Sequence, residues 1–197
     1  MDFQLNEDQE ALRDGVRAFC EGRVPLEQLP ALDEKGAFDA ELWSDLAELG
    51  VFSLRVPEAL GGVGLGNADA VLVFAELGRR LVPGPLAWSH LAADLVEGAG
   101  SGEVVVGGLD LLGPTYGPLL VEHRDHLNTL LVLDAKGVFR VDEPARLEAD
   151  PIEKPLDPLT PLHRLRERPS GEQIAGPEVA EKLRLEGAAL LSAQLLG

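Results

Sequence analysis

Apolar residues in the first half of the chain recur at helical spacing, which predicts a series of helices. Asn6 and Gln9 match the capping-box pattern that begins a helix, and residues 7–22 then carry one apolar face. Asp39 can cap a second helix that ends at Gly50, where a glycine is favoured after the last turn. The apolar positions of these two helices are Leu12, Val16, Phe19, Leu42, Trp43, Leu46 and Leu49.

A third helix is predicted with Asn67 as its cap, in the run ADAVLVFAELGRRL. Its apolar residues lie on nearly all sides, which is typical of a buried, central helix. Residues 83–85, Pro-Gly-Pro, break this helix, and a fourth helix is expected over residues 86–97. The glycines and the serine of residues 98–102 then form a linker.

The pattern changes after this linker and predicts strands. Residues 103–109, 128–134 and 138–142 form short segments that are rich in branched residues and separated by turn signals. Residues 135–137, Ala-Lys-Gly, are expected to connect the last two segments as a hairpin. Residues 143–176 contain six prolines and predict irregular strands and loops at the edge of a small sheet.

A last helix begins at Pro177, a favourable residue for a first turn, and becomes more apolar toward residue 197. We expect another part of a longer protein, or another chain, to cover this apolar end. The predicted fold class is therefore α+β. Residues 1–98 form a helical domain, residues 99–176 a small β-domain, and residues 177–197 the start of a further helical domain.

Charge and cysteine content narrow the classes of function. Asp and Glu number 34 against 17 Lys and Arg, so the formal net charge is −17. Binding to nucleic acid or to an anionic membrane requires a basic face, and we expect neither. Cys20 is the single cysteine, so no disulfide forms within the chain. The acidic N-terminus and the absence of a long apolar run predict no signal peptide and no membrane span, and we expect a cytoplasmic protein.

A glycine-rich loop, RVPEALGGVGLG, occupies residues 55–66. It fits neither the dinucleotide pattern GxGxxG nor the phosphate-loop pattern GxxxxGK[ST], because the third glycine is misplaced and no lysine follows. A nucleotide cradle is therefore disfavoured. The loop is better explained as a turn that needs a positive φ and a close approach of backbone.

This loop, followed by a helix that contains AELGR, resembles the N-terminal domain of the acyl-CoA dehydrogenases. The opening FQLNEDQEALRDGVRAF and the run DAELWSDLAELGVFSL also stand in the order found in that family. The resemblance covers residues 1 to about 97. The matching residues are Pro57, Glu58, Gly61, Gly62, Gly64, Glu76, Leu77, Gly78 and Arg79.

The resemblance implies a helical N-terminal domain, a middle β-domain and a C-terminal four-helix bundle. It also implies an oxidoreductase of fatty acid or steroid degradation, in which FAD takes a hydride from C3 of an acyl-CoA and a carboxylate removes the C2 proton. Most members carry that carboxylate in the C-terminal domain, so we assign no catalytic residue to this chain. The family further implies a homo- or hetero-oligomer with acyl-CoA dehydrogenase-type subunits, and an electron acceptor similar to electron-transfer flavoprotein.

The middle region departs from the family pattern. The runs "T-E-P-x-x-G-S-D" and "W-I-T-N", which lie beside the flavin in the family, are absent from this sequence. Thr115 and Tyr116 offer hydroxyls near a turn instead. FAD is therefore implied for the complete enzyme and is not favoured for this chain alone. Three readings stay open: part of an enzyme, a flavin-degenerate partner subunit, or a binding module that kept the fold.

The segment after the third helix lines the acyl tail in the family, and here it reads VPGPLAWSH, residues 82–90. The resemblance thus implies four substrate-binding residues, and it implies that the glycine-rich loop lets backbone crowd against the acyl tail. Apolar walls matter because each buried methylene contributes about 0.8 kcal/mol. Alternatively, the apolar residues simply pack the domain core. The four candidates are Pro85, Leu86, Trp88 and Ser89.

Other clusters favour structural roles. His123 and His126, with Glu122, precede a strand and indicate a surface turn, so no metal site is expected. An alternating arginine row predicts a solvated strand face, the alternative being contact with an acidic surface or a CoA phosphate. Glu76 is expected to pair with Arg79, and Cys20 to be a core residue rather than a nucleophile. The arginines are Arg164, Arg166 and Arg168.

Overall fold

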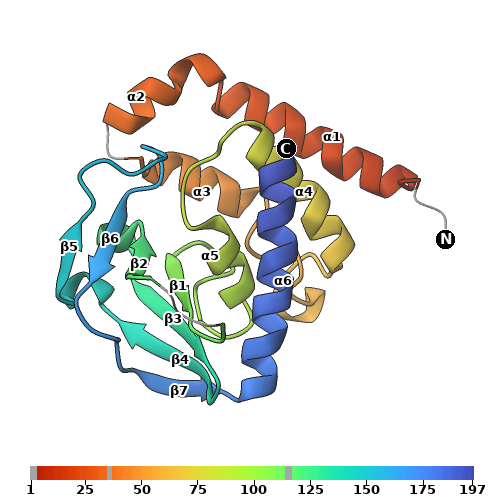
Figure 1. The fold of residues 1–197 in the computed structure, drawn as a ribbon. Coiled ribbons are helices and arrows are strands. Elements are labelled where there is room, and N and C mark those ends of the chain that lie inside the picture. Colours follow the sequence, from red (N-terminus) through yellow and green to blue (C-terminus); the bar gives the residue numbers. More distant parts are fainter. Residues whose placement is uncertain (1–3, 35–36, 114–116) are drawn as a thin grey trace.

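The computed structural model describes residues 4–34, 37–113 and 117–197, so Thr115 and Tyr116 lie outside the described residues. Helices gather on one side of the molecule and strands on the other (Figure 1). The helices are α1 (Glu7–Arg23), α2 (Leu29–Glu34), α3 (Ala40–Glu48), α4 (Asn67–Arg79), α5 (Leu86–Ala92) and α6 (Pro177–Leu196). Single 3-10 turns are η1 (Leu26–Gln28), η2 (Glu58–Leu60), η3 (Arg124–His126) and η4 (Pro144–Arg146).

Local capping sets the starts of the helices. The Asn6 side chain accepts a hydrogen bond from the Gln9 backbone at 2.8 Å, which confirms the capping box of α1. Asp39 caps α3 as predicted. Gly66, rather than Asn67, is the N-cap of α4, and the Asp69 carboxylate accepts its backbone N–H at 2.9 Å. The prediction for Asn67 was wrong: it is the first residue of the helix, and its side chain accepts a hydrogen bond from Arg55 and donates one to Glu186.

The predicted strands form two small sheets. β3 (Thr129–Asp134) and β4 (Gly137–Asp142) pair as the expected hairpin, while β1 (Val106–Asp110) runs parallel to β3. β7 (Glu172–Ala175) pairs with β4, which gives the order β1-β3-β4-β7. The second sheet has the order β2-β6-β5 and is antiparallel. Its strands are β2 (Leu119–Glu122), β5 (Ala149–Pro151) and β6 (Leu162–Leu165).

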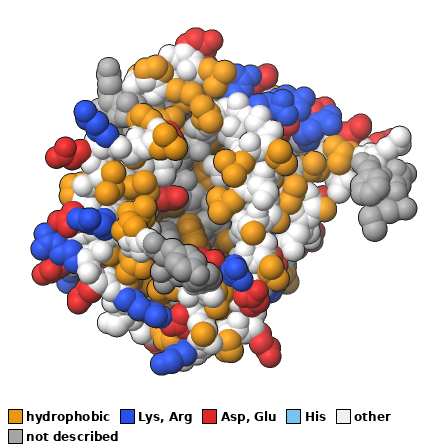
Figure 2. Space-filling view, in the orientation of Figure 1, with side chains coloured by type: hydrophobic (Ala, Val, Ile, Leu, Met, Phe, Trp, Pro, Cys, Tyr) orange, Lys and Arg blue, Asp and Glu red, His pale blue; other side chains and the backbone are white. Residues whose placement is uncertain are grey.

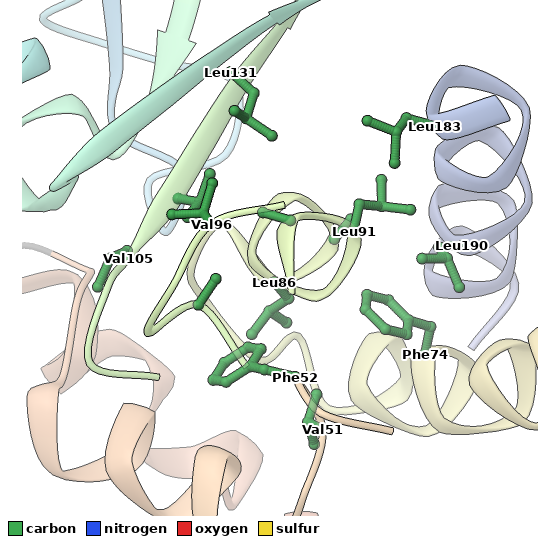
Figure 3. Packing of buried hydrophobic residues seen from close by; sticks show 14 of the residues in the cluster. Val51, Phe52, Phe74, Leu86, Leu91, Val96, Val105, Leu131, Leu183 and Leu190 are labelled. Atoms are coloured by element: carbon green, nitrogen blue, oxygen red, sulfur yellow. The ribbon is translucent and has the colours of Figure 1, made fainter. Parts of the chain in front are cut away.

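One buried cluster joins the helices to the first sheet. Figure 3 shows α5 between the strands and α6, with Leu91 facing α6 and Val96 on the sheet side. Phe74 of α4 and Leu190 of α6 continue the same cluster. The fold is therefore a mixed α+β structure, as predicted. The domain boundaries at 98/99 and 176/177 stay a prediction, because the cluster contains residues from all three segments.

α6 crosses α4 with almost no space between the two backbones. A Cβ added at Gly78 would lie 1.9 Å from the Gln194 carbonyl oxygen, so the glycine of the AELGR run permits this crossing. In the same run, the buried Glu76 carboxylate accepts hydrogen bonds from Arg17 of α1 at 2.7 and 3.0 Å, and Arg79 approaches it at 3.3 Å. The predicted pair with Arg79 is confirmed. Arg17 is the partner that sequence reasoning missed.

None of the helices in residues 4–34, 37–113 and 117–197 has the length and apolar character needed to cross a membrane.

Candidate functional site

A cavity of about 370 Å³ lies where the end of α4, the start of α5 and the last turns of α6 meet the second sheet. Figure 2 shows hydrophobic side chains around a hollow on this face, with an acidic side chain in it. The volume falls at the low end of the range found for small-ligand pockets. Its lining residues are Gly78, Leu81, Val82, Pro83, Gly84, Pro85, Leu86, Ala87, Trp88, Glu122, Asp157, Leu159, Thr160, Leu191, Gln194 and Leu195.

Three of the four predicted site residues line this cavity. Pro85 and Leu86 are buried and Trp88 is half-buried, and all three belong to its wall. Ser89 lies elsewhere: its hydroxyl is fully buried, accepts the Val106 N–H at 2.9 Å and approaches the Val106 carbonyl at 3.2 Å. Ser89 therefore fixes α5 to β1. A role of these four residues in substrate binding stays a prediction.

The backbone between α4 and α5 is shaped by Gly84. This residue has a φ of +119°, and a Cβ on it would lie 3.1 Å from the Trp43 ring. A glycine here allows the loop to pack on that ring while Pro83 and Pro85 limit its freedom. The loop therefore fixes the start of α5, and Leu86 and Trp88 lie in the cavity wall without a bound ligand.

The polar groups of the cavity come from the β half of the chain and from α6. Asp157 accepts hydrogen bonds from the Leu159 backbone at 3.0 Å and from the Thr160 hydroxyl at 2.6 Å, so its carboxylate is fixed. Glu122, at the end of β2, forms no hydrogen bond or ion pair with any described residue. Glu122 keeps an exposed surface, but partial burial against the cavity lining, with a smaller contribution from Asp157, raises its pKa above the usual range.

The glycine-rich loop takes no part in this cavity. The loop contains η2 and leads into α4, and it folds back on its own backbone, with the Gly64 N–H donating to Val56 O at 2.9 Å. Gly61 and Gly64 have φ values of +82° and +73°, and a Cβ at Gly62 would lie 2.1 Å from Val56 O. The turn interpretation is confirmed. The expectation that these glycines let backbone crowd against an acyl tail stays a prediction; the close approach that the structure shows is to the chain's own backbone at Val56.

A partly buried polar network that sequence reasoning missed connects α5 to α6. The His90 ring bonds to the Val51 carbonyl at 2.8 Å through Nδ1 and accepts the Arg55 Nε–H at 2.8 Å through Nε2. Arg55 also pairs with Glu186 of α6 at 2.9 Å. Burial, opposed by the bond to Val51, lowers the pKa of His90 to about 4, so the ring is neutral. No local pattern marks these residues, since they lie far apart in the sequence.

The histidines after β2 form a turn, η3, as predicted, but His123 is only 2% exposed rather than on the surface. It enters the turn with a φ of +50°, which directs its ring inward. His126 stacks on Phe38 with ring centroids 4.7 Å apart. Within the described ranges, no three His, Cys, Asp or Glu side chains form a group that could hold a metal.

The remaining candidates have structural roles. Arg164 lies in β6, whereas Arg166 and Arg168 follow the strand, and all three pair with carboxylates of this chain: Arg164 and Arg166 with Asp150, and Arg168 with Asp134. Cys20 is fully buried, and burial raises its pKa to about 11. The core interpretation of Cys20 is therefore confirmed, because a protonated, inaccessible thiol is a poor nucleophile.

These features agree with comparison to known proteins. The family model described as acyl-CoA dehydrogenase, N-terminal domain, matches residues 6–104. The chain therefore belongs to the acyl-CoA dehydrogenase family.

Two curated relatives show how far the likeness extends. The acyl-CoA dehydrogenase IpdE2 of Mycolicibacterium smegmatis is 36% identical over 153 residues, which cover 70% of this chain and 46% of the relative. The benzylmalonyl-CoA dehydrogenase of Aromatoleum aromaticum is 42% identical over 79 residues, or 40% of this chain and 21% of the relative. The matched residues thus cover less than half the length of either relative.

Solved structures share the fold over nearly the whole chain. The ChsE4–ChsE5 complex from Mycobacterium tuberculosis matches with a TM-score of 0.73 at 20% identity, covering 98% of this chain and 64% of that one. A glutaryl-coenzyme A dehydrogenase in complex with glutaryl-CoA matches with a TM-score of 0.72 at 19% identity, covering 98% and 65%. This chain therefore shares the fold of about two thirds of each of these two proteins.

Proposed function

We propose that this chain forms one wall of the acyl pocket in an acyl-CoA dehydrogenase-type protein. In the complete enzyme, the activity proposed is FAD-dependent α,β-dehydrogenation of an acyl-CoA thioester. The observation that supports this is the cavity, in which Pro85, Leu86 and Trp88 oppose the apolar residues of α6 in a chain of this family.

The wall acts by excluding water and by holding the acyl group in one position. Leu86 and Trp88 stand on the first turns of α5, and Ser89 fixes that helix to β1. Each acyl methylene that they cover contributes about 0.8 kcal/mol to binding. A rigid wall keeps most of this energy, because little side-chain freedom is lost when the ligand binds.

The described residues do not fit FAD. The arginines beside the second sheet, which carry the charge that a pyrophosphate needs, are already paired with Asp150 and Asp134. The buried polar atoms without a partner lie on residues that do not line the cavity. We therefore derive no flavin contact and no catalytic step from this chain, and assign no catalytic residue to it.

This misfit favours a second candidate function, that of a flavin-degenerate partner subunit. Such a chain would bind an acyl-CoA dehydrogenase-type subunit and complete or stabilise its acyl site. The absence of the two flavin-facing runs supports the same proposal. In either case an acceptor similar to electron-transfer flavoprotein would reoxidise the flavin of the complete assembly.

Tryptophan fluorescence tests the acyl pocket, because Trp88 lines the cavity and the only other tryptophan, Trp43, does not. Hexanoyl-CoA is expected to change the emission of the purified chain, whereas free CoA at the same concentration is not. The variant Trp88→Phe should abolish this change, while Trp43→Phe should keep it. Equal responses to CoA and to hexanoyl-CoA would contradict the proposed pocket.

Flavin absorbance separates the two candidate functions. Purified chain that carries the visible absorbance of oxidised flavin supports an enzyme in its own right. Colourless chain that gains this absorbance only when mixed with an acyl-CoA dehydrogenase-type subunit supports the partner subunit. Chain that stays colourless in both conditions contradicts the partner subunit and leaves the flavin to the rest of the complete enzyme.

A further inference from the structure

The charges at the cavity wall all have one sign. Among the described residues, its lining contains two carboxylates, Glu122 and Asp157, and no Lys, Arg or His. The rest of the lining is apolar, apart from Thr160 and Gln194. Both carboxylates are exposed to solvent, but an acyl group that enters the cavity would displace water between itself and them, and this strengthens their effect on it.

Glu122 is the group that is free to act on a ligand. Its side chain is exposed to solvent at the end of β2, and it is one of the residues that line the cavity. It has no hydrogen-bond or ion-pair partner among the described residues. A carboxylate in this position accepts a hydrogen bond from any donor that enters the cavity, and it repels an anion.

Asp157 adds a second negative charge, and its carboxylate is held in one orientation by hydrogen bonds. The backbone N–H of Leu159 and the hydroxyl of Thr160 each occupy one of its oxygens. The two carboxylates already disfavour each other, because Asp157 contributes to the raised pKa of Glu122. A third carboxylate, on the acyl group of a ligand, would be repelled by both.

We propose that Glu122, assisted by Asp157, makes this pocket select acyl groups without a carboxylate and favour those with a hydroxyl group at the end that reaches Glu122. The inference rests on the proposed function, since it takes the cavity to be the acyl pocket. It assigns this chain a substrate class opposite to that of the glutaryl-CoA bound in the structural neighbour, whose acyl group ends in a carboxylate.

The test compares three CoA thioesters with the same six-carbon chain: hexanoyl-CoA, 6-hydroxyhexanoyl-CoA and adipoyl-CoA. Binding to the full chain is followed by Trp88 fluorescence, with free CoA as the blank. Adipoyl-CoA is expected to bind about tenfold more weakly than hexanoyl-CoA, because its terminal carboxylate is brought close to two carboxylates of the same sign. The hydroxylated thioester is expected to bind at least as tightly as hexanoyl-CoA.

Two variants of Glu122 assign the selectivity to this residue. Glu122→Gln should remove most of the tenfold difference, and Glu122→Lys should reverse it in favour of adipoyl-CoA. The control is Glu153→Gln, which makes the same change in net charge at an exposed residue outside the cavity lining and should leave the difference intact. Circular dichroism checks that each variant is folded.

The outcomes separate the inference from the proposed function. If hexanoyl-CoA binds but adipoyl-CoA binds equally well, or if the hydroxylated thioester binds more weakly than hexanoyl-CoA, the inference is wrong and the acyl pocket stands. If Glu153→Gln relaxes selectivity as much as Glu122→Gln, the effect is one of net charge and the inference is again overturned. If no thioester changes the Trp88 signal, the proposed function fails and the inference fails with it.

Discussion

The crossing of α4 and α6 gives the sharpest prediction, because one methyl group tests it. We consider Gly78→Ala. The new Cβ would lie 1.9 Å from the Gln194 carbonyl oxygen and 2.6 Å from its carbon. Contacts below 3.0 Å are essentially never seen for real Cβ atoms, so the two helices must separate by about 1.1 Å. Both contacting groups are backbone, so no rotamer change relieves the clash.

The expected loss of stability follows from two opposing effects. Overpacking of this kind costs about 1–3 kcal/mol, and backbone contact places it near 3 kcal/mol. Alanine in a helix interior returns about 0.5–1 kcal/mol relative to glycine. The net loss in the free energy of unfolding is therefore about 2 kcal/mol, which corresponds to a melting temperature lower by about 4–8 °C in a chain of this size.

The chain offers a matched control in Gly15, which lies inside α1, is exposed and has nothing within 4 Å of an added Cβ. Gly15→Ala should raise stability by about 0.5–1 kcal/mol. Urea unfolding followed by far-UV circular dichroism gives both values, and the two variants should differ by about 3 kcal/mol. If Gly78→Ala were as stable as Gly15→Ala, the close backbone crossing described above would be wrong.

Three further predictions concern buried groups. The hydrogen bond from Arg17 lowers the pKa of Glu76 below 4.5, so their pairing stabilises the fold above that pH. The free energy of unfolding that Arg17→Met loses, measured in urea, should therefore become smaller as the pH falls below 4.5. A loss that does not change with pH would contradict the pairing. Burial lowers the pKa of His90 from 6.5 to about 4, so the unfolded chain takes up a proton at a higher pH than the folded chain does. As the pH falls from 6.5 to 4, this residue should therefore lower the free energy of unfolding by about 3 kcal/mol. His90→Gln should remove this part of the pH dependence of stability, and an unchanged pH dependence would argue against it. Cys20 should react with a thiol reagent only as fast as the chain unfolds, and rapid labelling of the native chain would show that its burial is not maintained.

Much of the fold could be predicted because its signals are local. The capping box of α1 involves residues three positions apart, and the β3–β4 hairpin involves strands separated by a short turn. Pro177 marks the start of α6 for the same reason. The boundaries were less accurate: the fourth helix ends at Ala92 rather than near residue 97, because the chain then turns toward β1.

The candidate site was predicted only in part. Leu86 and Trp88 could be named because they follow a helix in the order that the family resemblance implies, and the structure places both in the cavity wall. Glu122 and Asp157 could not be named as members of the same wall. They are far from α5 in the sequence, and only the docking of the second sheet beside α6 brings them to it. Ser89, named with Leu86 and Trp88, faces Val106 because an α-helix turns by about 100° per residue.

The sequence by itself determined where helices and strands begin, which loop needs glycines, and which family the chain resembles. These are decided by hydrogen bonds, sterics and apolar spacing within a few residues. Only the tertiary structure decided that Gly78 permits a helix crossing, that His90 and Arg55 connect α5 to α6, and that two carboxylates share the cavity wall with Leu86 and Trp88. Such relations depend on which surfaces are buried together, and the free energy of that burial is a property of the whole chain.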